Sequence, residues 1–136
     1  MIHRIEPDRV FGVPDLISRV SVPSGRDLAF LSGQVARDEE VRVVGKGDHV
    51  AQVMQTVRRI DRAHGGLGAG RQDTVKETVH VVDYEPRPTP AVLGALHGSL
   101  PPLPTLVGAA RLSAPEFLSE VECVIALPSP AEGLAG

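Results

Sequence analysis

The chain has 136 residues, 42% of them hydrophobic, and a formal net charge of −3 at pH 7. This length is enough for one domain with its own hydrophobic core. Lysine and arginine are scattered instead of forming a basic stripe, so nucleic acid is not expected as a partner. No apolar run approaches the roughly 20 residues that span a bilayer, and the first residues lack the apolar region of a signal peptide. A membrane is therefore not expected as a partner either.

Cysteine and histidine bear on the compartment and on metal binding. The single cysteine cannot form an internal disulfide, which favours a reducing, cytoplasmic setting. The five histidines show neither H-x-x-x-H nor H-E-x-x-H spacing and have no cysteine close by, so no metal site is expected. The glycines of "HGGLGAGRQD" follow a helix pattern and do not open a helix after a strand, so they are interpreted as a helix stop and turn.

Three short segments at the start of the chain have strand patterns. Residues 1–7, "MIHRIEP", predict an edge strand that ends at its proline. Residues 15–25 alternate in polarity until a Pro-Ser-Gly turn. Residues 28–35, "LAFLSGQV", are apolar on both faces, which predicts an interior strand, and a charged loop follows.

The strongest helix pattern covers residues 48–66. Asp48 is the predicted N-cap, because its carboxylate can accept a hydrogen bond from a free N–H of the first turn. The apolar residues of this segment recur at spacings of three and four and form one stripe, which faces the core. The stripe consists of Val50, Val53, Met54, Val57 and Ile60. The glycine pair at its end predicts the C-terminal stop.

The second half of the chain predicts three more strands and a weaker helix. Residues 74–83 alternate between valine and polar residues, which indicates a half-buried strand. A proline-rich connector at 84–90 leads to a short helix at 91–100. Residues 105–112 and 119–127 predict the last two strands, and the end of the chain, 128–136, is expected to be a disordered tail.

The predicted order is β-β-β-α-β-α-β-β in a single domain, residues 1–127. This order favours an α+β fold with a single mixed sheet and both helices on one face, because each helix stripe needs an apolar partner. The other sheet face still carries valine and alanine. A homo-oligomer is the simplest way to cover it.

Three residues near the end of the chain are candidates for chemistry or packing. Strand alternation puts Cys123 with the apolar core residues, where a buried thiol is a poor nucleophile. Glu122 then faces the open side of the sheet, either in a site or in an interface hydrogen bond or ion pair. Arg111 is predicted on the same strand face as Thr105, where it can hold a substrate carboxylate or pair with a neighbouring subunit.

Several motifs in this order resemble the reactive intermediate deaminase (Rid, YjgF/UK114-like) family. They are "FLSGQVARD", "GDHVAQVMQTVRRID", "VKETVHVVD" and "GAARLSAPEFLSEVECVIAL", and with their spacing they cover residues 16–127. The resemblance implies a chorismate-mutase-like fold, a homotrimer, and small-molecule substrates bound in clefts between subunits. It implies no metal or organic cofactor. Archetypal members hydrolyse imines and enamines to a carbonyl compound and ammonia.

The site residues that the resemblance implies are only partly present. Gly33, within Ser-Gly-Gln, and Glu122 match the elements that orient the attacking water. Position 104, which carries the arginine that binds the substrate carboxylate in archetypal members, is Pro104 here. Ile17 occupies the position of the usual aromatic residue, and Arg19 is an alternative cation if its side chain faces the cleft.

Two functions follow from this pattern. The first is a divergent Rid-type enzyme that acts on an imine, enamine or related reactive carbonyl compound by hydrolysis, tautomerisation or cyclisation, with Glu122 as general acid and base, in a specialised pathway. The second is a metabolite-binding or regulatory trimer without chemistry. An acidic balance and few aromatic residues argue against a ribonuclease.

Overall fold

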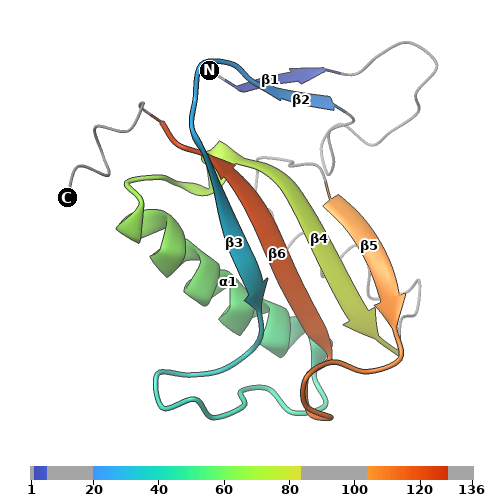
Figure 1. The fold of residues 1–136 in the computed structure, drawn as a ribbon. Coiled ribbons are helices and arrows are strands. Elements are labelled where there is room, and N and C mark those ends of the chain that lie inside the picture. Colours follow the sequence, from blue (N-terminus) through green and yellow to red (C-terminus); the bar gives the residue numbers. More distant parts are fainter. Residues whose placement is uncertain (1, 6–19, 84–103, 129–136) are drawn as a thin grey trace.

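The computed structural model describes residues 2–5, 20–83 and 104–128, and every structural statement below refers to these residues. They form a two-stranded sheet, a four-stranded sheet and one long helix, α1 (His49–Gly66), which packs against one face of the larger sheet (Figure 1). The α+β class expected from the sequence is confirmed. The predicted connector at 84–90, the predicted helix at 91–100, Ile17, Arg19 and residues 129–136 of the predicted tail lie outside the described residues.

The strands divide between two sheets. The smaller sheet pairs β1 (Ile2–Ile5) with β2 (Val20–Pro23) in antiparallel fashion. The larger one contains the other four strands in the order β3-β6-β4-β5. Their bounds are Leu28–Gln34 for β3, Thr74–Val82 for β4, Pro104–Ala109 for β5 and Ser119–Ala126 for β6. Only the β4–β5 pair is parallel, so the sheet is mixed.

The interior position predicted for residues 28–35 is not found among the described residues, and residues 15–19 of the preceding strand pattern lie outside them. Among the described residues β3 pairs with β6 alone, at the edge of the four-stranded sheet. Its second apolar face is not covered by the described part of the chain, since the Phe30 side chain is 76% exposed. Within the described residues, the apolar side chains on both faces of β3 therefore present one covered and one uncovered surface.

The two central strands, β4 and β6, have one buried and one open face. The buried side chains face α1 and form the core with Val53, Val57 and Ile60 of the helix. They are Val75, Glu77, Val79 and Val81 of β4 and Val121, Cys123 and Ile125 of β6. Because neighbouring side chains along a strand point to opposite faces, Lys76, Thr78 and Glu122 lie on the open face.

Helix α1 begins as predicted but buries a more polar stripe than expected. The Asp48 carboxylate accepts a hydrogen bond from the Ala51 N–H at 3.0 Å. Val50 and Met54 are exposed, whereas Gln52 is fully buried, which corrects the predicted stripe. The Gln52 amide donates to the Glu116 carbonyl and accepts from the Leu118 N–H, both at 2.8 Å, so its burial leaves no polar group unsatisfied.

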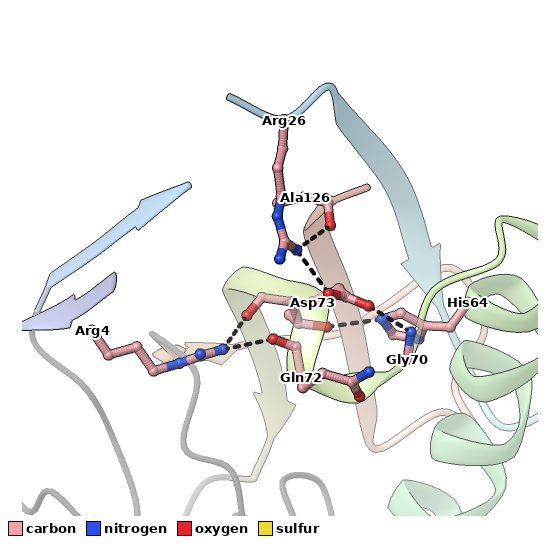
Figure 2. A network of polar contacts seen from close by, with 8 residues as sticks. Arg4, Arg26, His64, Gly70, Gln72, Asp73 and Ala126 are labelled. Atoms are coloured by element: carbon pink, nitrogen blue, oxygen red, sulfur yellow. Dashed lines mark hydrogen bonds and ion pairs between the residues drawn. The ribbon is translucent and has the colours of Figure 1, made fainter. Parts of the chain in front are cut away.

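A network of polar contacts surrounds the buried carboxylate of Asp73, just before β4 (Figure 2). Asp73 accepts a hydrogen bond from the Arg26 guanidinium at 2.8 Å and from the Gly70 N–H at 2.9 Å. The same arginine nitrogen donates to the Ala126 carbonyl of β6 at 3.3 Å. Arg4 of β1 donates to the backbone beside Asp73, so the smaller sheet is held to the larger one by arginine side chains.

Replacement of this carboxylate is expected to destabilise the fold strongly. Asp73→Ala leaves the Arg26 guanidinium without its charged partner in a largely buried position, at a cost of about 3 kcal/mol in the free energy of unfolding. Urea denaturation measures the change. Arg42→Ala, which removes an exposed ion pair with Asp38, is the control and is expected to cost less than about 1 kcal/mol. Equal effects of the two variants would contradict this account of Asp73.

Candidate functional site

A hollow of about 420 Å³ lies on the face of the four-stranded sheet opposite α1. Three neighbouring strands, β3, β6 and β4, contribute its walls. It is lined by Phe30, Leu31, Ser32, Lys76, Thr78, Glu122, Cys123 and Val124. Register places Glu122 directly opposite Thr78, so the carboxylate and the hydroxyl are nearest neighbours across the β4–β6 ladder.

A break in the β3–β6 ladder shapes one side of the hollow. The register shifts between Leu31 and Gln34, as it does at a β-bulge. Gly33 lies in this break, and a Cβ on it would come within 2.7 Å of the Glu120 side-chain carbon Cδ. Only glycine permits this close approach without displacing Glu120. A side chain at position 33 would therefore require the flexible Glu120 side chain to move.

Glu122 is available for chemistry. Among the described residues its carboxylate has no hydrogen-bond or ion-pair partner, and the side chain is exposed at the hollow. An ionised carboxylate with free lone pairs can accept a proton from a water molecule or bind a donor group of a ligand. The sequence-based placement of Glu122 on the face opposite Cys123 is confirmed.

Lys76 brings a positive charge to the same hollow, and the sequence analysis did not single it out. Its ammonium group donates a hydrogen bond to the Thr105 hydroxyl at the start of β5. It has no ion pair with a carboxylate among the described residues. The register pairs Thr105 with Thr78 and Pro104 with Glu77, so this lysine lies beside the position where the resemblance implies an arginine. Lys76 is two residues before Thr78 in β4, so both side chains point to the same sheet face. This spacing could have identified Lys76 from the sequence.

The predicted site residues are not all brought together. Gly33, Glu122 and Thr105 lie at or next to the hollow. Arg111 is exposed, follows the end of β5 at Ala109 and does not line the hollow, so it is not on the strand face where the sequence placed it. Pro104 begins β5.

Cys123 borders the hollow through its strand, but its side chain packs in the core and is 4% exposed. Burial, together with the smaller effect of the nearby Glu77 and Glu122 charges, raises the pKa of the thiol to about 12. A thiol that stays protonated at neutral pH is a poor nucleophile. The structural role predicted for Cys123 is therefore supported by its burial.

This protonation state predicts a low reactivity of Cys123. At pH 8 the folded protein is expected to react with iodoacetamide at least about 100-fold more slowly than the urea-unfolded chain, because the pKa of the unfolded thiol returns to its ordinary range. Mass spectrometry of timed aliquots measures both rates. Rates within a factor of ten would show that the thiol is not held protonated in the fold.

Neither a metal centre nor a membrane-spanning element is found in the described residues. No three His, Cys, Asp or Glu side chains of residues 2–5, 20–83 and 104–128 are grouped so that they could hold a metal ion. Within the same ranges no helix has the length and apolarity needed to cross a bilayer.

Comparison with known proteins defines the class to which this fold and site belong. The family model described as Endoribonuclease L-PSP matches residues 19–127, and the chain belongs to this family, also known as the YjgF/UK114 or Rid family. Its members typically form trimers. None of the curated proteins searched matches the chain.

Solved structures agree with this assignment. The Rid-family protein YyfB from Yersinia pestis is 26% identical, with a TM-score of 0.83, and the match covers 93% of this chain and 98% of that one. Rv2704 from Mycobacterium tuberculosis is 24% identical, with a TM-score of 0.62 over 93% and 99% of the two chains. TdcF from Escherichia coli with bound serine is 20% identical, with a TM-score of 0.61 over 77% and 84%.

Proposed function

We propose that the chain is a Rid-type enzyme that acts on a small imine, enamine or related reactive carbonyl compound. The observation that carries the proposal is the convergence of Glu122, Lys76, Ser32 and Thr78 on one hollow of about 420 Å³. A carboxylate, an ammonium group and hydroxyls around a small volume suit a small polar metabolite. TdcF, which shares the fold, binds serine, a ligand of this size and polarity.

Hydrolysis of an imine is the reaction that these groups fit best. Water adds to the C=N carbon, and the Glu122 carboxylate accepts a proton from the attacking water. The same carboxyl group then returns this proton to the nitrogen of the carbinolamine that forms from the protonated imine. The C–N bond breaks, ammonia leaves, and the carboxylate accepts the remaining hydroxyl proton, which yields the carbonyl compound. One acid–base group therefore serves both steps, and the balance needs no redox partner.

Lys76 provides the charge that binds an anionic group of the substrate in this proposal. It already lies beside β5, where it donates to Thr105. An ammonium group is a compact point charge and does not form the two parallel hydrogen bonds of a guanidinium, so a planar carboxylate is held less specifically than by an arginine. Substrates other than simple 2-imino acids are therefore expected to be favoured.

Assembly into a homotrimer through the open sheet face is part of the same proposal. Three large apolar side chains on strands of that sheet are well exposed: Phe30 at 76%, Leu28 at 46% and Val107 at 38%. Contact with other copies removes this apolar surface from water. It also encloses the hollow, which in a single copy is open to solvent, and makes it a cleft between subunits.

Imine hydrolysis tests the catalytic proposal. An amino-acid oxidase generates 2-imino acids from several amino acids, and semicarbazide traps what the protein does not hydrolyse first. The wild-type protein is expected to compete with the trap for at least one imine, and Glu122→Gln to lose about 100-fold or more of that rate, because general acid–base groups contribute this much. Lys76→Met is expected to raise KM for anionic imines more than it lowers kcat.

Pro104→Arg in the same experiment reports on the substrate class. A guanidinium at 104 is expected to speed hydrolysis of simple 2-imino acids at least about tenfold, because the resemblance to the Rid family implies an arginine at this position as the bidentate partner of the carboxylate. Unchanged rates in Glu122→Gln would contradict the catalytic role of Glu122. Saturable metabolite binding that persists in Glu122→Ala, without product from any imine, would favour the metabolite-binding trimer instead.

The trimer is tested by the mass of the particle in solution. Phe30→Asp places a charge in the proposed contact and is expected to convert trimers to monomers, because an unpaired carboxylate is costly to bury. Met54→Asp is the control, since Met54 is 48% exposed on α1, on the opposite side of the sheet. Light scattering after size exclusion measures both. Trimers of Phe30→Asp, or monomers of the wild type, would contradict the assembly.

A further inference from the structure

A second hollow, of about 560 Å³, lies outside the site described above. It is formed between the outer side of α1 and the loop that follows β3. The loop has a fixed shape: Arg37 and Val43 form an isolated β-bridge, and the Asp38 carboxylate accepts hydrogen bonds from the N–H groups of Glu40 and Arg42. The hollow is therefore bordered by a helix on one side and a hydrogen-bonded loop on the other.

This second hollow, called the groove below, is lined by more positively than negatively charged side chains. Its lining contains five arginines, namely Arg37, Arg42, Arg58, Arg59 and Arg62, and three carboxylates, namely Asp38, Glu39 and Glu40. All three carboxylates form ion pairs with only two of the arginines. Arg42 pairs with Asp38 and Glu40, and Arg62 pairs with Glu39. Among the described residues the remaining three arginines have no carboxylate within 4.0 Å. The groove thus carries an excess of positive charge.

The three unpaired arginines are held in place by neutral groups. Arg58 donates to the Gln55 side chain at 2.9 Å, and Arg59 donates to the Arg37 carbonyl at 3.3 Å. Gln55 in turn donates to that same carbonyl at 2.8 Å. The Arg37 guanidinium lies 5.0 Å from the centre of the Phe117 ring. Neutral partners position the guanidinium groups without neutralising them, which leaves their charge for a ligand.

We propose that this groove binds a small polyanion, of the class of phosphate esters and diphosphates. Guanidinium groups form paired hydrogen bonds to phosphate oxygens, and three of them balance a ligand with two or three negative charges. The carboxylates of Asp38, Glu39 and Glu40 hold Arg42 and Arg62 in ion pairs, which limits the free positive charge of the groove to that of the other three arginines. The size of the hollow suits one small molecule and not a chain.

Pyrophosphate, titrated into the full-length protein in a calorimeter at low ionic strength, tests this site. Saturable binding with one ion per chain is expected, weakening as salt is added. Arg58→Ala and Arg59→Ala are each expected to weaken it at least about tenfold. Arg58 is exposed, so its removal leaves the fold intact. Arg71→Ala is the matched control, because Arg71 is bound by Asp61 outside the groove, and it is expected to leave the affinity unchanged.

Removal of the Glu39–Arg62 ion pair is expected to have the opposite effect on the affinity for pyrophosphate. Glu39→Gln releases Arg62 from its carboxylate and is expected to tighten pyrophosphate binding. Absence of saturable binding, equal affinities of the wild type and Arg58→Ala, or weaker binding by Glu39→Gln would each overturn the proposal. Tight binding of a single-stranded oligonucleotide without binding of pyrophosphate would overturn it as well. Glu122→Gln is expected to leave this binding unchanged, because Glu122 lines the other hollow, so the result is independent of the catalytic proposal.

Discussion

The antiparallel pairing of β6 with β4 is the interaction on which the rest of this structure depends. Its register puts Val121 opposite Val79 and Glu122 opposite Thr78. One face of the ladder therefore belongs to the hydrophobic core, and the other face carries the candidate site. A slip of one residue would exchange the two faces, burying Glu122 under α1 and exposing Cys123. The apolar contacts with the helix therefore fix the register, and the register in turn places the carboxylate.

The helix also acts on the site through polar contacts. Gln52 on α1 binds the Glu116 carbonyl and the Leu118 N–H, which belong to the loop directly before β6. This loop leads into β6, the strand that carries Glu122. The buried Gln52 amide on the α1 side of the sheet therefore fixes the start of a strand that contributes Glu122 to the open face. The apolar stripe predicted from the sequence does not include this glutamine. Satisfied hydrogen bonds explain why it is nevertheless buried.

The charges of the molecule are divided between two regions with different chemistry. The hollow on the open sheet face combines the ammonium group of Lys76 with the carboxylate of Glu122, which has no ion-pair partner among the described residues. The groove on α1 combines several arginines with few acids and has no comparable acid–base group free of an ion pair. Membership of the Rid family accounts for the fold. The second region is formed by side chains of α1 and of the loop that follows β3.

The sequence determined the local structure and the faces. Alternation of valine with polar residues in β4, the N-cap at Asp48 and the burial of Cys123 follow from period and capping rules that act within a few residues, and each was predicted. Only the tertiary structure decided which strands are neighbours, because pairing depends on segments far apart in the chain. The edge position of β3 and the approach of Lys76 to Thr105 are of this kind. The cation beside position 104 comes from another strand, and no local pattern shows how distant side chains meet.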